Sequence, residues 1–295
     1  MCIDYLYHHE DNCSTEIHRR FRLNMPQNRI NVACRSSMMQ WMQTVVSFIG
    51  FEPETVEIAM SYLDRFLQTP QGQDATECRT IFQLCAMTAL YVAVKINCAE
   101  ALTPKLLAEL SQGSFEADQF ETMEQLMLSA LEWRVNPPTG ASFVRETFEI
   151  LPESLFADEE IRQTVLDTAQ VQVDWALGDY ELVTVKKSVV AFAAVANSLE
   201  RQGIRVFNLQ QFLESTLESS NSCSLDFDMK EVSLIRKALC EALPASNCVG
   251  QTNDLDSGLL EDASLKSLDN DIERAPRKSI SAESSSPRSV FGNNS

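Results

Sequence analysis

One stretch of the chain, residues 79–97, has almost no hydrophilic face. Its apolar run is interrupted only by Gln83 and Thr88 before it ends at Lys95. A helix that is apolar on all sides must be surrounded either by lipid or by other helices. The run is about 14 residues long, whereas a helix needs roughly 20 apolar residues to cross a bilayer. The pattern therefore predicts the buried central helix of a helical bundle and not a membrane-spanning segment.

Amphipathic segments flank this stretch, and their apolar residues recur every three or four positions. The predicted helices of the first half cover residues 34–49, 53–67, 79–97, 103–113 and 116–131. Thr103 and Pro104 are typical of a helix start, and the run Asn136-Pro137-Pro138 is typical of a stop. The pattern thus predicts five helices in one unit.

The second half repeats this arrangement. Residues 188–199 form a second strongly apolar helix. The amphipathic segments around it cover residues 143–151, 161–177, 209–217 and 229–243. We therefore predict an all-α protein made of two tandem five-helix bundles, each built around a buried central helix.

The composition changes after Pro244. Residues 244–295 are rich in serine and contain no Tyr or Trp. Such a segment cannot bury enough apolar surface to offset the entropy lost on ordering, so we predict a disordered tail. The predicted divisions are an N-terminal arm at 1–30, a first bundle at 31–136, a second bundle at 137–243 and the tail at 244–295.

Charge and cysteine usage narrow the functional classes. The net charge of -18 and the pI near 4.6 argue against nucleic acid as a partner, because phosphate binding requires a basic surface. Nine cysteines without any CxxC pair, and an N-terminus unlike a signal peptide, predict reduced thiols inside the cell, with no disulfides and no zinc. His8, His9 and His18 all lie near the N-terminus. We therefore expect no metal, no cofactor and no catalytic triad.

Four motifs of the first half occur together: CRSSMMQWMQTV, AMSYLDRFL, ALYVAVK and EWRVNPPTGASF. They resemble, in this order, the first helix of the cyclin box (usually written MRAILVDWL), its second-helix signature, the end of its third helix and its close. The resemblance covers about residues 30–150 strongly and the second half in helix pattern only. The tryptophan in LEWRVNPPT, the length and the short N-terminal arm are more similar to D-type than to mitotic cyclins. The Leu-x-Cys-x-Glu motif of many D-type cyclins is absent.

Resemblance to cyclins implies a regulatory subunit that binds and activates a cyclin-dependent protein kinase in G1/S control and has no active site of its own. It also implies a location in the nucleus and the cytoplasm. The positions that match kinase contacts are Lys95, Ile96, Glu124 and Leu128. Considered without the resemblance, Lys95 is a solvated cation at the negative end of a helix dipole. Family members follow this lysine with one or two glutamates, whereas this chain has Asn97 and Cys98, so the choice of kinase stays open.

The resemblance also implies a groove for Arg-x-Leu substrate or inhibitor peptides. The positions that match it are Cys34, Met38, Trp41 and Gln83. Ser36 and Ser37 stand where the family has apolar residues, which predicts a shallower or more polar groove. Arg35 and Asp64 match a pair that is ion-paired inside family members. We interpret this pair as a structural salt bridge between two helices and not as a docking site.

Two other functional classes compete with the kinase regulator. A transcription-related adaptor can carry the same repeated fold, but it needs basic helices that face DNA and often has a zinc ribbon, and this chain has a net charge of -18 and no CxxC pair. A helical enzyme needs a phosphate loop, a His–Cys pair or converging carboxylates. The sequence shows none of these patterns.

Overall fold

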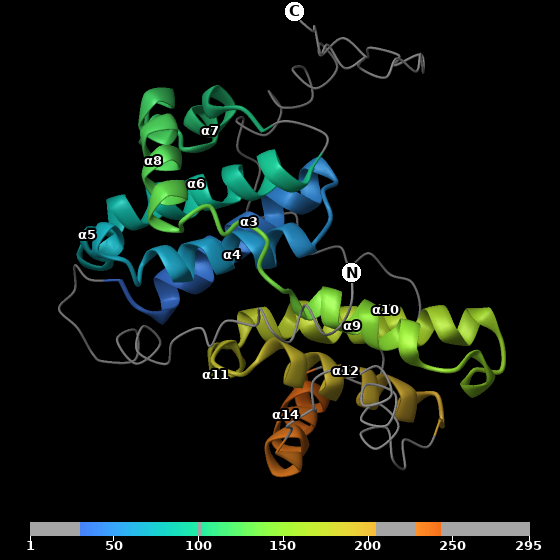
Figure 1. Ribbon diagram of the computed structural model, residues 1–295. Helices are drawn as coiled ribbons and strands as arrows, with labels where there is room; N and C mark the ends of the chain where they lie inside the picture. The colour runs from blue at the N-terminus through green and yellow to red at the C-terminus, as the bar shows by residue number, and fades with distance from the viewer. Residues whose placement is uncertain (1–29, 99–101, 205–227, 243–295) are drawn as a thin grey trace, which may run out of the picture. The chain divides into compact units, whose positions relative to one another are not determined.

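A computed structural model describes residues 30–98, 102–204 and 228–242, and Figure 1 shows their arrangement. All regular secondary structure in these three segments is helical, which confirms the all-α prediction. The predicted arm and tail, and the predicted helix at 209–217, lie outside the described residues. Residues 1–252 form one compact unit, so the divisions proposed after residues 136 and 243 stay predictions.

The described helices follow one another in two groups, which we call the first and the second bundle. The first bundle contains α3 (Val32–Ile49), α4 (Glu54–Phe66), α5 (Gln73–Glu77), α6 (Arg79–Asn97), α7 (Pro104–Leu110) and α8 (Ala117–Ala130), with a 3-10 turn at Pro70–Gly72. The second bundle contains α9 (Gly140–Ile150), α10 (Glu159–Gly178), α11 (Tyr180–Val183), α12 (Lys187–Arg201) and α14 (Met229–Ala242), with a 3-10 turn at Glu153–Leu155.

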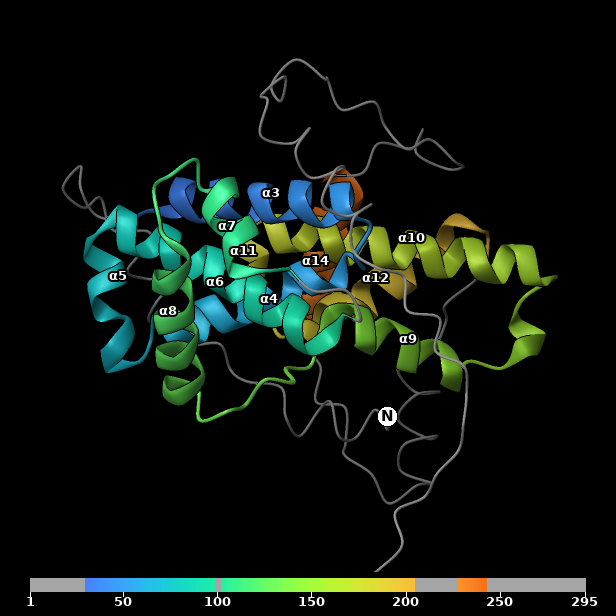
Figure 2. The same ribbon diagram turned by 90° about the horizontal axis from the view of Figure 1, so that it is seen from above.

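Helix α6 is the centre of the first bundle, and both views show it between α4 and α8 (Figure 1 and Figure 2). Every residue from Cys85 to Val94 is buried. By length and composition alone α6 could cross a membrane, but 61% of its most apolar window is already buried inside the protein. This burial is what a core helix of a bundle requires. The only buried polar residue in the run is Thr88, whose hydroxyl donates to the Leu84 carbonyl oxygen at 2.8 Å.

Local residues set the ends of these helices. The side chain of Asn31 accepts a hydrogen bond from a backbone N–H in the first turn of α3. Gly50 ends the same helix at φ 84°, in the left-handed region that glycine adopts freely, and its N–H donates to the Val46 carbonyl oxygen at 3.0 Å. The side chains of Thr103 and Thr139 accept the same kind of hydrogen bond from the first turns of α7 and α9. The predicted stretches therefore become helices close to their predicted bounds.

Each bundle has its own hydrophobic core. The first core takes its buried residues from α3 to α8, with Leu177 added from α10, and the second takes its buried residues from α9 to α14. Helices α5 and α11 are absent from our predictions because, at 5 and 4 residues, they are too short to show a periodicity. The structure therefore has two cores. It also contains two short helices, α5 and α11, that the sequence pattern does not predict.

The segment that links the bundles lies along α4. The Tyr62 hydroxyl donates to the Val135 carbonyl oxygen, and Arg65 Nη2 donates to the Arg134 carbonyl oxygen at 2.8 Å. Burial raises the pKa of Tyr62 to about 12, so this hydroxyl keeps the proton that it donates. Two side chains of α4 thus fix the start of the link.

Candidate functional site

The C-terminal end of α6 carries a charge pair with α8. Lys95 Nζ donates to both carboxylate oxygens of Glu124, at 2.7 and 3.0 Å, and lies 5.2 Å from the centre of the Tyr91 ring. The hydrogen bond to Glu124 is the main reason why the pKa of Lys95 is raised. The Lys95 side chain is 52% exposed and that of Glu124 is 11% exposed. Lys95 therefore stays charged at the surface, and Glu124 lies beneath it.

The four candidate kinase-contact residues lie at different depths. Ile96 is 44% exposed next to Lys95, whereas Glu124 is 9% and Leu128 only 6% exposed. Leu128 belongs to the core of the first bundle. The structure thus brings Lys95 and Glu124 into direct contact and leaves Ile96 accessible. It does not present Leu128 as a free apolar anchor.

Trp133 is a large exposed side chain that the sequence analysis does not assign to a site. It is 69% exposed, just after the end of α8. The backbone N–H of Trp133 donates to the Leu128 carbonyl oxygen at 3.0 Å, and Glu132 and Trp133 adopt φ values of 53° and 59°. Left-handed backbone is unusual for residues other than glycine and costs of order 1 kcal/mol or more per residue. Sequence gives no signal for this turn, because neither residue type favours it.

The residues of the candidate peptide groove come from two packed helices. Cys34, Met38 and Trp41 lie on α3, Gln83 lies on α6, and α3 packs against α6. All four are half-buried, and the three on α3 pack against the first core. Of the two serines, Ser37 is exposed and Ser36 is half-buried. This placement leaves the peptide groove a prediction.

Arg35 and Asp64 form a two-pronged ion pair between α3 and α4. Arg35 Nε donates to Asp64 Oδ1 at 3.1 Å, and Arg35 Nη2 donates to Asp64 Oδ2 at 2.7 Å. Their side chains are only 2% and 5% exposed. Paired, parallel hydrogen bonds of this kind fix orientation as well as charge. The pair therefore joins two helices in the interior and offers no free group to a ligand.

Two observations on the described residues concern metal ligands and cysteine reactivity. There, no group of three or more His, Cys, Asp or Glu side chains is placed to hold a metal ion. Burial raises the pKa of Cys85 to about 12, and its thiol lies 3.6 Å from the Met123 sulfur. Because the thiolate is the reactive form, this cysteine acts as a core residue.

The sequence and the structure both have known relatives. Residues 1–136 match the family model described as "Cyclin, N-terminal domain". Cyclin-D3-2 of Arabidopsis thaliana is 36% identical over 115 residues, which cover 38% of this chain and 30% of that protein. Human G1/S-specific cyclin-D1 is 24% identical over 204 residues, which cover 67% of this chain and 66% of cyclin-D1. The crystal structure of a viral cyclin from herpesvirus saimiri has a TM-score of 0.55 at 18% identity and covers 77% of this chain and 97% of its own.

These comparisons agree with the motifs and the fold. Residues 1–136 thus match the N-terminal domain of cyclins, and the fold is similar to that of a viral cyclin. The relatives include D-type cyclins of plants and mammals. The match spans less than two thirds of the length of these relatives.

Proposed function

We propose that this chain is the regulatory subunit of a cyclin-dependent Ser/Thr protein kinase, that it acts in G1/S control, and that it has no active site of its own. The match of residues 1–136 to the N-terminal domain of cyclins supports the class of function. The observation that carries the proposal is the surface formed by the charge pair between Lys95 at the end of α6 and Glu124 on α8, which lies beside the exposed Ile96. Trp133 is exposed in the turn that follows α8.

This surface has the composition of a protein-binding site. Apolar side chains that stay exposed, together with charged groups at their edge, are typical of the centre and rim of an interface. We propose that it contacts the mobile helix of the kinase and the loop beside it. That contact would set the kinase's own Lys–Glu pair and free its activation loop. It activates only to the extent that the active form of the kinase binds more tightly than the inactive form.

Asn97 bears on the choice of kinase. Its Nδ2 donates to the Ala93 carbonyl oxygen of its own helix at 2.9 Å. Where family members have a glutamate, this chain thus has an amide that is already hydrogen-bonded within α6. We therefore propose that Ile96 and Trp133 contribute more to kinase selection here than a charged anchor does.

The proposed peptide groove at α3 and α6 is a second binding activity of the same protein. It would recruit Arg-x-Leu substrates or inhibitors to the kinase complex in the nucleus and the cytoplasm. The half-buried Trp41 and Met38, which pack against the first core, support it as an apolar floor. Fluorescence polarisation with a labelled Arg-x-Leu peptide tests the groove, and a peptide with the Arg and Leu exchanged for Ala is the control.

The kinase proposal is tested by the activity that co-purifies with the chain. Ile96→Asp and Lys95→Glu change exposed side chains and should spare the fold, because neither removes core packing. A reversed charge at an interface lowers the association rate and adds repulsion. We expect both variants to lose most of the co-purified kinase activity at limiting kinase concentration.

The control needs an exposed lysine outside this surface. Lys237→Glu on α14 is suitable because the Lys237 side chain is 74% exposed and pairs only with Glu241 on its own helix. Lys187 is unsuitable, since it contacts the buried Glu57. Full kinase activity in folded Ile96→Asp and Lys95→Glu proteins would show that this surface does not activate a kinase.

A further inference from the structure

The N-terminal half of α4 holds the start of the second bundle through two carboxylates. Glu57 is 6% exposed, and its Oε1 accepts the Gly140 N–H at 2.9 Å and lies 3.4 Å from Lys187 Nζ. Glu54, one turn earlier, accepts the Thr139 hydroxyl and a hydrogen bond from Arg145 Nη2 at 2.8 Å. We call this contact, where α4 meets α9, α10 and α12, the seam.

Helix α10 crosses the seam at the same point. A Cβ atom on Gly140 would lie only 2.4 Å from Val173 Cγ1 and 3.5 Å from Glu57 Oε1. Glycine is therefore required there, and α10 passes directly over the first turn of α9. The next residue on α10, Asp174, is half-buried. No hydrogen bond or ion pair to Asp174 is found among the described residues, although Glu54 and Glu57 lie close enough to repel its charge.

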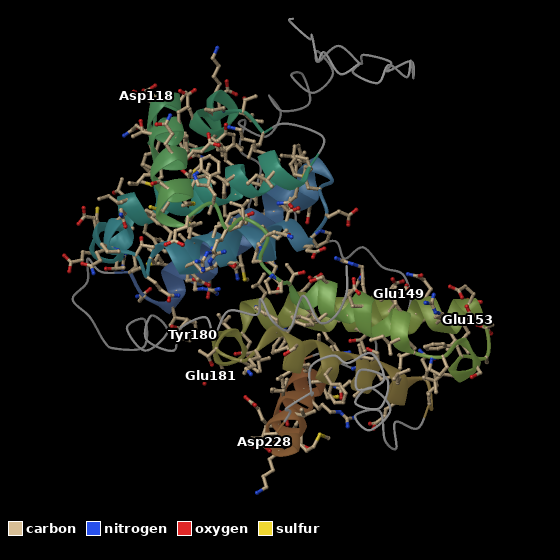
Figure 3. All side chains as sticks on the ribbon, in the orientation of Figure 1. Asp118, Glu149, Glu153, Tyr180, Glu181 and Asp228 are labelled. Atoms are coloured by element: carbon tan, nitrogen blue, oxygen red, sulfur yellow. The ribbon has the colours of Figure 1, made fainter. Side chains whose placement is uncertain are left out.

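The other helices packed against α10 leave this carboxylate uncompensated. Arg145 on α9 and Lys187 on α12 contact the two carboxylates of α4. Arg35, Asp64 and Arg65 line a pocket together with Glu57, Lys187 and Leu177, which is one turn after Asp174 on α10. Arg145 is bound to Glu54, Lys187 to Glu57 and Arg35 to Asp64, and Arg65 donates to the Arg134 carbonyl oxygen. Figure 3 shows Tyr180 and Glu181 at α11, which adds a further acid and no cation. Each of these cations thus already has a partner other than Asp174.

A carboxyl group in this position binds a proton more tightly than it does in water. Burial, and then the charges of Glu57 and Glu54, raise the pKa of Asp174 from 3.8 to about 7. Both causes act against the charged form, since neither a donor nor a cation offsets them.

We propose that the seam between the two bundles is a proton-linked contact, in which Asp174 holds a proton while α10 lies against α4 and releases it when the contact opens. The neutral carboxyl group removes one negative charge from a site whose cations already have other partners. The stability of the seam between the first and the second bundle therefore depends on pH close to neutrality. This inference does not rest on kinase binding.

The direction of the effect follows from proton linkage. The folded-state pKa lies above the unfolded value, so the folded protein binds one more proton between about pH 4 and pH 7. The stabilisation is complete at the acid end, falls as the pH rises through 7, and is absent above about pH 8. Between pH 6 and pH 8 this one group should lower the equilibrium constant for closing the seam by up to about tenfold.

The test is hydrogen exchange at the Gly140 amide, which donates to Glu57 across the seam. Protection is expressed relative to the unstructured amide, so that the intrinsic pH dependence of exchange cancels. In the full-length protein we expect protection at Gly140 to fall by up to about tenfold between pH 6 and pH 8. Asp174→Asn, which cannot ionise, should keep its protection across that range. Asp167→Asn is the matched control, because Asp167 is exposed on the same helix and bonds only to Gln163.

A direct titration keeps the inference testable if Asp174→Asn does not fold. The carboxyl carbon of Asp174 in the unmodified chain should titrate by NMR with a midpoint near 7, about three units above an exposed aspartate. A midpoint near 4 would overturn the inference. Equal loss of Gly140 protection in Asp174→Asn and the unmodified protein would also overturn it. Neither measurement involves a kinase, so a failure here leaves the proposed function untouched.

Discussion

Helices α6 and α12 occupy the same place in their bundles but are held in different ways. The buried run of α6 contains one polar residue, Thr88, and its hydroxyl bonds only within the helix. The buried run of α12 contains Ser188, Asn197 and Ser198. Helix α6 is thus positioned in its core by apolar packing, while α12 also carries polar groups that need specific partners.

A hydrogen-bond network joins α12 to its neighbours. Gln172 Nε2 on α10 donates to Ser198 Oγ at 2.8 Å, and Asn197 Nδ2 donates to Gln172 Oε1 at 3.1 Å. Arg236 Nε on α14 donates to Asn197 Oδ1 at 2.9 Å, and its Nη2 pairs with Glu200 at 2.5 Å. Three helices are therefore fixed to one another by directed bonds around a single buried amide.

The difference between the contacts of α6 and those of α12 explains where the candidate interaction surface lies. The end of α12 is occupied by structural contacts, because Glu200 and Asn197 both bind Arg236. At the end of α6, Lys95 pairs with Glu124 and Asn97 bonds within its own helix, whereas Ile96 stays exposed. A core held by apolar packing leaves the polar end of its central helix free for a partner.

The largest expected effect comes from placing a charge in the apolar core. Ala89, at the centre of α6, is 0% exposed and has only apolar surroundings. Ala89→Asp should destabilise the first bundle by several kcal/mol, because an unpaired buried charge has no compensating group. Far-UV circular dichroism and thermal melting measure the loss. A soluble Ala89→Asp protein with unchanged melting would show that α6 is not buried as described.

The next effect tests the ion pair between α3 and α4 in the first bundle. Arg35→Ala leaves Asp64 charged and buried, and should cost about 3–5 kcal/mol in urea unfolding. The double variant Arg35→Met with Asp64→Leu removes both charges and should recover most of that loss. If the single variant were as stable as the unmodified chain, the pair would not be a buried structural contact.

A matched pair of substitutions compares the two central helices directly. Asn197→Leu in α12 leaves Gln172 and Arg236 with unmet hydrogen bonds and should cost about 1–3 kcal/mol. Thr88→Val in α6 removes a hydroxyl that bonds only to its own helix, and should change stability by less than about 1 kcal/mol. Urea midpoints of the two variants give the comparison. Equal costs would contradict the distinction between the two cores.

The smallest effect is expected at the surface end of α6. Lys95→Met removes an ion pair whose cation is half-exposed and screened by solvent, so it should cost less than Arg35→Ala, in which both partners are buried. Arg236→Met on α14 breaks hydrogen bonds to both Asn197 and Glu200 and should cost more. Thermal unfolding of the two variants, side by side, measures the difference. If Lys95→Met lowered the stability more than Arg236→Met does, the end of α6 would have a structural role like that of the end of α12.

The sequence predicts the two central helices well because burial on every side leaves a continuous apolar run. It predicts the depth of Leu128 poorly, since four-residue spacing places Leu128 and Glu124 on one face but does not say how deeply that face is covered. The left-handed turn at Trp133 and the seam at Gly140 have no local signal. They depend on contacts between residues far apart in the chain, such as the Glu57–Gly140 bond across 83 positions.

The bond between Glu57 and the first turn of α9 bears on the order in which the chain folds during synthesis. Helices α3 to α8 are synthesised before Gly140, so α4 can already be folded when the first turn of α9 emerges. The second bundle, by contrast, begins with a helix whose first N–H group has its acceptor on another bundle. We therefore expect the first bundle to fold as an independent unit on the nascent chain and to act as the template on which the second one assembles.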